Sequence, residues 1–243
     1  MYGMYGYGYG YGYGLDPTII LVLIGVALSL WAQGRVNSTF SRYSRVRSMT
    51  GMTGAEAARR LLNAQGIYDV TVQPIAGELT DHYDPRTKTV NLSQSVYGAT
   101  SVAAIGVAAH ECGHAMQDNE GYAPLRFRSA LVPAANFGSK LSWPLILLGL
   151  VFGGLGSPLV EIGILMFSLA VLFQLVTLPV EYNASARAVR LLDAQGILAG
   201  EEVNGTRKVL NAAALTYVAA AATSILQLLR LIILFGGRNR RDR

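Results

Sequence analysis

The feature that most constrains this 243-residue chain is its set of long, nearly uncharged apolar stretches. They cover residues 15–33, 141–178 and 211–235, and Gly156, Ser157 and Pro158 interrupt the second one. A helix of about 20 apolar residues crosses the hydrocarbon core of a bilayer. Only 14% of the residues are charged, against roughly 25% in soluble domains. We therefore predict three or four transmembrane helices: 15–33, a hairpin over 141–178, and 211–235, which either spans the membrane or packs in it.

The segments between the apolar stretches have the mixed polar and apolar sequence pattern of a soluble domain. Residues 35–140 form its main part, and 179–210 hold a further helix that completes it. Hydrophobic spacing and turn residues predict the following elements: a helix over 53–65, strands over 70–75 and 87–92 separated by a turn at 83–86, and a long helix over 101–117. The predicted fold class is α+β and mainly helical, with a small antiparallel sheet anchored by the membrane helices.

The two ends of the chain are biased in composition. Residues 1–14 are a Tyr-Gly repeat, predicted to be a disordered tail, and residues 236–243 are a basic tail. Four arginines follow the first apolar stretch, which by the positive-inside rule places that side in the cytoplasm and the Tyr-Gly tail outside. Basic residues flank 211–235 on both sides, so whether that helix spans stays open. We expect a multi-pass protein of the cell membrane with a cytoplasmic catalytic domain.

Composition also limits the classes of partner and site. The net charge of +5 comes from arginines beside apolar segments, not among stacking aromatic residues, so we expect a lipid bilayer and no nucleic acid as partner. Cys112 is the only cysteine, which excludes an intrachain disulfide and a cysteine-rich zinc site. A bound metal must therefore rely on histidine and carboxylate ligands.

Residues 110–114 read His-Glu-Cys-Gly-His, the H-E-x-x-H pattern of zinc hydrolases, on the predicted helix over 101–117. Four residues advance about one turn, so His110 and His114 face the same way and can hold one ion. Glu111 points about 100° away and can reach a water on that ion as a general base. We therefore predict one Zn²⁺ per chain with His110 and His114 as ligands and Glu111 as the catalytic base.

Catalytic zinc usually has three protein ligands, so a third must come from elsewhere in the chain. The candidates are His82, Asp118, Glu120 and Glu181. Asp118 lies on the same helical face as His114 but far from His110. Glu181 lies where the second apolar stretch re-enters the soluble part, and from there a second helix could approach both histidines. We favour Glu181 and leave the others open.

Three segments carry a resemblance to a known family. They are HECGHAMQ at 110–117, DHYDP at 81–85 and PVEYNAS at 179–185, and together they resemble the bacterial YugP-like neutral zinc metallopeptidases over about residues 15–235. The resemblance implies a membrane-bound, zincin-like (gluzincin) fold with His110, His114 and Glu181 as ligands and Glu111 as base. Residues 181–185 are also similar to the E-x-x-A-D element of HtpX-type membrane peptidases, but Ser185 replaces the acid.

Two further residues are candidates for contact with the oxyanion or the substrate. His82 and Tyr83 precede the strand predicted over 87–92, and we expect that strand to be an edge on which an extended peptide pairs. The expected function is that of a zinc-dependent endopeptidase that cuts polypeptides, including membrane-associated ones, near the cytoplasmic membrane surface. The alternative is a membrane scaffold whose zinc is purely structural. The oligomeric state stays open.

Overall fold

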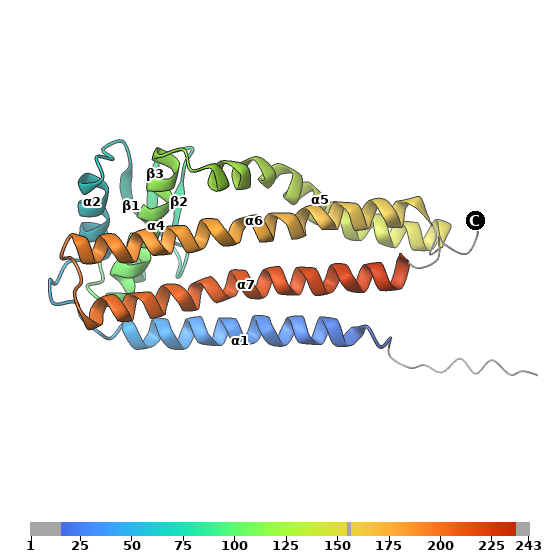
Figure 1. The fold of residues 1–243 in the computed structure, drawn as a ribbon, viewed down its shortest axis with the longest axis horizontal. Coiled ribbons are helices and arrows are strands. Elements are labelled where there is room, and N and C mark those ends of the chain that lie inside the picture. The colour runs from blue at the N-terminus through green and yellow to red at the C-terminus, as the bar shows by residue number, and fades with distance from the viewer. Residues whose placement is uncertain (1–15, 155–156, 237–243) are drawn as a thin grey trace, which may run out of the picture.

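The computed structural model describes residues 16–154 and 157–236. The predicted tail over 1–14 and residues 237–243 of the basic tail lie outside these ranges. Figure 1 shows an elongated bundle of long helices with a small α/β part at one end. In the described ranges, four helices are long and apolar enough to cross a membrane, which confirms the three or four that we predict. They are α1 (Ile19–Tyr43), α5 (Ala123–Gly153), α6 (Pro158–Ala194) and α7 (Glu201–Phe235).

The long helices form two antiparallel pairs, α1 with α7 and α5 with α6 (Figure 1). Small residues allow α1 and α7 to approach closely: the Thr223 hydroxyl donates to the Gly25 carbonyl at 3.1 Å, and a side chain at Gly25 would collide with Thr223. At the end far from the α/β part, Arg230 of α7 forms an ion pair with Asp16, with 3.4 Å between the charged groups. These contacts hold the N-terminal part of α1 against the C-terminal part of α7.

Each of these helices continues well beyond its apolar stretch. The apolar stretch within residues 15–33 is the first half of α1, which runs on to Tyr43. The hairpin over 141–178 consists of the second half of α5 and the first half of α6. Pro179 does not end α6, so the helix predicted separately after residue 178 is the last part of α6. Helix α6 is therefore continuous from its apolar membrane segment into the α/β part of the molecule.

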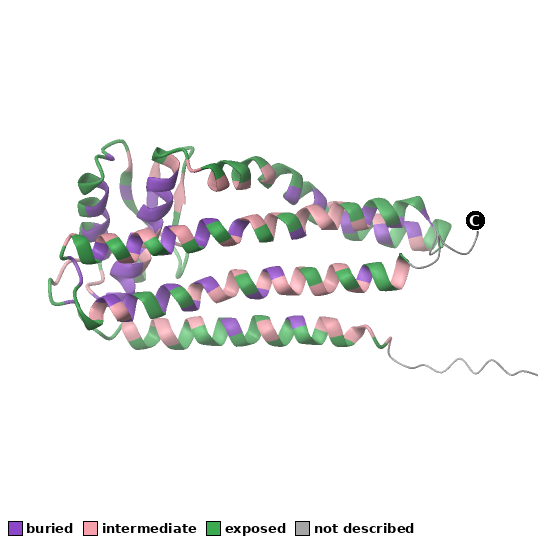
Figure 2. Cartoon of the chain, in the orientation of Figure 1, coloured by how far each residue is buried: buried purple, intermediate pink, exposed green. Residues whose placement is uncertain are grey.

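The bundle exposes many large apolar side chains, while buried residues concentrate in the α/β part (Figure 2). Leu30 of α1 is 69% exposed, and Val151 and Phe152 of α5 are 75% and 81% exposed. Contiguous apolar surface on this scale is rare on soluble monomers and requires another apolar phase to cover it. The exposed faces agree with a bundle surrounded by lipid.

The sheet has three strands in the order β1-β3-β2: β1 (Thr71–Ile75), β2 (His82–Asp84) and β3 (Thr89–Ser93). It corrects two predictions. β1 pairs in parallel with β3, so the sheet is mixed and not antiparallel. The strand predicted over 87–92 is β3, which lies in the centre, because the segment predicted as a turn forms the additional strand β2 and takes the edge.

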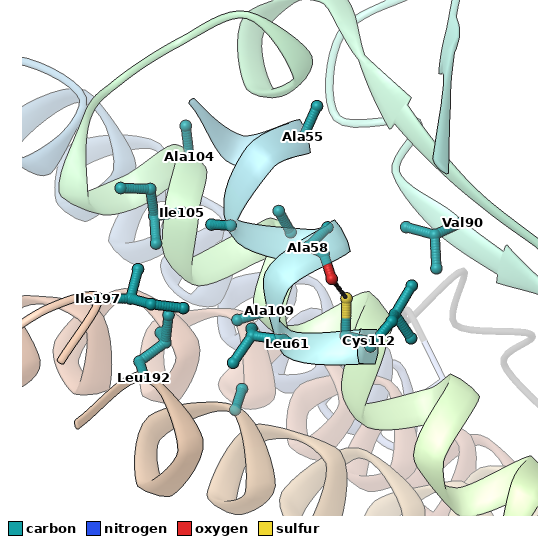
Figure 3. Close-up of a cluster of buried hydrophobic side chains, with 14 of the residues drawn as sticks. Ala55, Ala58, Leu61, Val90, Ala104, Ile105, Ala109, Cys112, Leu192 and Ile197 are labelled. Carbon is teal, nitrogen blue, oxygen red and sulfur yellow. Dashed lines mark hydrogen bonds between the residues drawn. The ribbon is translucent and has the colours of Figure 1, made fainter. Parts of the chain in front are cut away.

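The core of the α/β part surrounds α4 (Val102–Asn119), the long buried helix predicted over 101–117. The Ser101 hydroxyl caps it by accepting from the Ala104 amide at 3.2 Å. Figure 3 shows the alanine-rich face of α4 against α2 (Gly54–Ala64), against Leu192 near the end of α6 and against Ile197 just after it. Cys112 is buried in this core and its thiol donates to the Ala58 carbonyl, so its role is packing. The short helix α3 (Gln94–Tyr97) links β3 to α4.

An eight-residue similarity within the chain, residues 60–67 and 190–197, has a local cause. Each segment ends a helix, α2 and α6 respectively, with a glycine in the left-handed conformation: φ is +70° at Gly66 and +60° at Gly196. The amide of the following buried isoleucine then donates back into the helix. Two equivalent helix ends explain the match without a repeat fold.

Gly113 sets the distance between α4 and α6. A Cβ atom built on Gly113 would lie 2.6 Å from the Ala184 carbonyl oxygen, so the two helices touch backbone to backbone. Because a carbonyl in a long helix cannot rotate away, any side chain here must push α6 off α4.

We predict that Gly113→Ala lowers the free energy of unfolding by about 1–3 kcal/mol, the usual cost of overpacking. Thermal unfolding of the detergent-solubilised protein measures the change. Gly98→Ala is the matched control, because a Cβ at Gly98 meets no atom within 4 Å and its φ is −97°. Equal melting temperatures for Gly113→Ala and the control would contradict the close helix contact.

Candidate metal centre

Two histidines of α4 and one glutamate of α6 converge beside the Gly113 contact. The Glu181 Oε2 atom lies 3.2 Å from His110 Nε2 and 3.5 Å from His114 Nε2. One ligand atom from each of the three residues lies within 4.8 Å of the others. Within residues 16–154 and 157–236 these three form the group that could hold a metal ion, and its members are those expected from the sequence.

The other candidates for the third ligand are engaged elsewhere. Asp118 accepts hydrogen bonds from the Tyr83 hydroxyl at 2.8 Å and from Lys88 Nζ at 2.7 Å. Glu120 forms an ion pair with Arg187 at 2.6 Å. His82 bonds through Nδ1 to the Thr80 carbonyl at 2.8 Å. Of the four candidates, Glu181 is therefore the one that faces both histidines.

The second nitrogen of each imidazole is held by a polar neighbour. His114 Nδ1 lies 3.0 Å from Gln117 Oε1, and Gln117 Nε2 donates to Val180 O and Asn183 Oδ1, both at 2.9 Å. Both amide hydrogens are thus used on α6, so the amide oxygen accepts a hydrogen bond from the Nδ1–H group of His114. His110 Nδ1 lies 3.1 Å from the Ser185 hydroxyl, at the position of the acid in the E-x-x-A-D element.

These bonds determine what the cluster can bind. With Nδ1 of His114 donating to Gln117, its Nε2 faces the Glu181 carboxylate, so either a proton or a metal cation can lie between the two. Burial disfavours the charged form of His114, but Glu181 and Glu111 outweigh burial and raise the pKa of His114 above its ordinary value. Two imidazole nitrogens and one carboxylate oxygen are a common donor set for catalytic zinc, so the residues fit the ion.

Glu181 is 2% exposed and uses its two oxygens differently. Oε2 faces the histidines, whereas Oε1 lies 3.6 Å from the Arg128 guanidinium of α5. A buried carboxylate is stable when positive charge compensates it. Arg128 therefore supports the ionised form that a metal ligand requires, and it contributes a positive charge to the site.

Two cavities, each of about 290 Å³, open on either side of the cluster. Both are lined by His110, Glu111 and Glu181, and both by Tyr217 of α7. The first extends between α1, α4 and α7 and has a mostly apolar wall. The second extends towards β2 and α5, where His82, Tyr83 and Arg128 line it. The cluster thus lies where two cavities meet, and Glu111 is accessible from both.

The structure adds residues that sequence reasoning missed. Tyr217 lines the same two cavities as Glu181 and Glu111, and Arg128 faces Glu181 from α5. Neither belongs to a local motif, so no sequence signal pointed to them. Gln117 could have been found, because it lies three residues after His114 on the same helical face. His82 and Tyr83 line one cavity as expected, but hydrogen bonds already engage their polar atoms.

Comparison with known proteins agrees with this geometry. The family described as "putative neutral zinc metallopeptidase" matches residues 18–236, so the chain belongs to this zinc metallopeptidase family. It is 49% identical over 217 residues to the Bacillus subtilis (strain 168) protein named "Putative membrane protease YugP", covering 89% of this chain and 96% of that protein. No solved structure matches the chain.

We predict that Gln117→Leu lowers zinc affinity about 10- to 100-fold, the usual effect of losing a hydrogen bond that orients a ligating histidine. Competition with a chelator of known affinity measures the change. The same substitution at the exposed Gln65, at the end of α2, is the matched control and leaves affinity unchanged. If Gln117→Leu binds zinc as tightly as the wild type, Gln117 does not orient His114.

Proposed function

We propose that this protein is a membrane-bound, zinc-dependent endopeptidase that hydrolyses peptide bonds near the cytoplasmic surface of the membrane. The observation that carries the proposal is the position of Glu111, beside a three-ligand cluster that opens to two cavities. A structural zinc site closes its fourth position with another protein ligand. A base beside an open cluster has a use only in catalysis, which disfavours the scaffold alternative.

A bound zinc ion would supply an activated water and polarise the carbonyl of the substrate. His110, His114 and Glu181 would hold the ion, and Gln117 and Ser185 keep the two imidazoles in orientation. The Glu111 carboxylate takes the proton of the attacking water and passes it to the nitrogen of the leaving amine. Glu111 is only 8% exposed, so few bulk waters compete for this proton.

The negative charge that develops on the carbonyl oxygen needs hydrogen-bond donors. His82 and Tyr83 remain proposed for this role or for substrate contact, since both line the cavity on the β2 side. Tyr217 is the stronger candidate, because its side chain faces the cluster at the junction of both cavities. Arg128 supplies a positive charge on the same side. We assign oxyanion stabilisation to Tyr217, supported by Arg128.

Substrate position follows from the two cavities and the sheet edge. An extended peptide can add to an edge strand through main-chain hydrogen bonds. The edge beside the cluster is β2, so β2 takes the role that we expected for β3. The peptide would run along β2, pass the cluster and enter the apolar cavity between α1, α4 and α7. Because that cavity borders the membrane helices, membrane-associated polypeptides are the proposed substrates.

The cytoplasmic location rests on charge distribution. Four arginines follow the apolar part of α1, at the end of the bundle that carries the cluster: Arg35, Arg42, Arg45 and Arg47. The positive-inside rule assigns such an end to the cytoplasm. Since α7 runs antiparallel to α1, its Arg230 lies beside Asp16 at the opposite end of the bundle.

We predict that purified wild-type protein carries about one zinc per chain and cleaves casein. Glu111→Gln keeps the zinc but lowers kcat by about 10²–10⁴, the contribution of a general acid–base group. Glu181→Ala loses the zinc. Metal analysis and a fluorescent casein assay, before and after chelation, measure both quantities.

Glu201→Gln is the matched control, because Glu201 is exposed at the start of α7 and lies outside both cavities. It should match the wild type in zinc content and rate. A Glu111→Gln variant that retains full activity would exclude the proposed base. If the zinc-loaded wild type cleaves neither casein nor pooled peptides, the result would favour the alternative, a membrane scaffold whose zinc is purely structural.

We predict further that Tyr217→Phe keeps its zinc and lowers kcat about 10²- to 10³-fold, the usual loss when one oxyanion donor is removed. Since the ring remains, packing of α7 is preserved. Tyr68→Phe is the matched control on an exposed tyrosine. A change in KM with unchanged kcat would show that Tyr217 contacts the substrate without stabilising the oxyanion.

A further inference from the structure

A third cavity, of about 680 Å³, lies between α1, α6 and α7 and is separate from the metal centre. Its lining is basic and polar. Arg35 and Arg42 reach it from α1, and Lys208 reaches it from α7. The remaining polar groups are hydroxyls and an amide, from Ser38, Thr39, Tyr43, Tyr182 and Asn211, and the apolar side chains are Ala212 and Leu215.

The three cations of this cavity lack compensating charge among the described residues. The described lining contains no Asp or Glu, and no carboxylate of the described chain forms an ion pair with Arg35, Arg42 or Lys208. Arg42 lies over the Tyr43 ring, with 5.6 Å from the guanidinium carbon to the ring centroid. Three like charges that converge from two helices repel one another, so the cavity favours an anion.

The cavity straddles the boundary between the polar and apolar parts of both helices. On α1 the apolar segment ends at Ala32, three residues before Arg35. On α7 the apolar segment begins at Ala212, four residues after Lys208. Because the helices are antiparallel, these two boundaries lie at the same level of the bundle. That level is where a lipid headgroup meets its acyl chains.

Exposed apolar side chains continue from the cavity along the membrane segment. On α7, Leu215 is followed at helical spacing by exposed residues on the same face: Val218, Ile225 and Leu229. On α1, Arg35 is followed in the opposite chain direction by Trp31, Ile24 and Ile20, which are also exposed. A soluble anion would leave these apolar side chains exposed, whereas the acyl chains of a phospholipid would cover them.

We propose that this cavity is a binding site for the headgroup of an anionic phospholipid. The phosphate lies among Arg35, Arg42 and Lys208, the hydroxyl of Thr39 donates to a headgroup oxygen, and the acyl chains lie along the stripes of α1 and α7. Basic pockets between membrane helices recognise anionic headgroups through such charge pairing. The site is distinct from the metal centre and does not depend on the proposed peptidase activity.

The test compares which lipid the full-length protein retains. Detergent-purified protein is incubated with an equimolar mixture of palmitoyl-oleoyl phosphatidylglycerol and phosphatidylcholine, and native mass spectrometry counts the bound lipids. The wild type should retain phosphatidylglycerol preferentially. Arg42→Gln with Lys208→Gln should lower that preference roughly 30-fold, since each basic side chain near the surface contributes about fivefold.

Two variants separate a defined site from general surface charge. Arg45→Gln with Arg86→Gln removes the same charge from exposed positions outside the cavity and should keep the preference. Ser38→Trp fills the cavity without changing charge and should reduce retention to about that of Arg42→Gln with Lys208→Gln. A melting temperature equal to that of the wild type shows that a variant folds. If Arg42→Gln with Lys208→Gln does not fold, Ser38→Trp alone tests the proposal.

Three results would overturn the proposal. The first is unchanged phosphatidylglycerol retention in both cavity variants. The second is an equal loss in the Arg45→Gln, Arg86→Gln control, which would assign the effect to net charge. The third is displacement of the lipid by inorganic phosphate at millimolar concentration, which would identify the ligand as a soluble anion.

Discussion

The metal centre depends on one contact, the meeting of α4 and α6 at Gly113 and Ala184. Neither helix can form the cluster alone, because the two histidines lie on α4 and Glu181 lies on α6. The contact leaves no room for a side chain at Gly113, since a Cβ there would lie 2.6 Å from a carbonyl oxygen. Gln117 joins the same two helices four residues later, through its bonds to Val180 and Asn183. The residue that orients His114 thus also fixes the distance between the two ligand-bearing helices.

The parts that sequence reasoning recovered are those that local spacing determines. The apolar stretches predict membrane helices because crossing a bilayer needs a minimum length, and the spacing of His110 and His114 defines a site within one turn of helix. Glu181 could only be ranked above Asp118 and Glu120, because its distance to α4 is a property of the packed structure. Tyr217 was missed for the same reason, since it lies 103 positions after His114 in the chain and no pattern links the two.

The errors in the sheet have a physical cause as well. β2 is only three residues long and follows Asp81, which accepts bonds from the amide and hydroxyl of Ser93 at the end of β3. Those bonds hold the short segment against β3, although its composition is typical of a turn. The additional strand moves β3 to the centre of the sheet and places His82 and Tyr83 at the edge beside the cavity. One tertiary contact therefore changes both the sheet topology and the surface offered to a peptide.

The continuity of α6 and α7 links the metal centre to the membrane. Pro179 lies within α6 just before Glu181, and the helix continues past the proline and delivers Glu181 to the histidines. The Gln117 amide, which donates to the Val180 carbonyl, attaches this part of α6 to α4. Different faces of α7 line different cavities: Lys208 and Asn211 line the basic cavity, while Val209, Leu210 and Tyr217 line the cavity beside the histidine–glutamate cluster. A helix is stiff over this distance, so a displacement of α7 at the headgroup level would also move Tyr217 relative to Glu181. A displacement of α7 by the surrounding bilayer would therefore change the distance between the groups proposed to perform the chemistry.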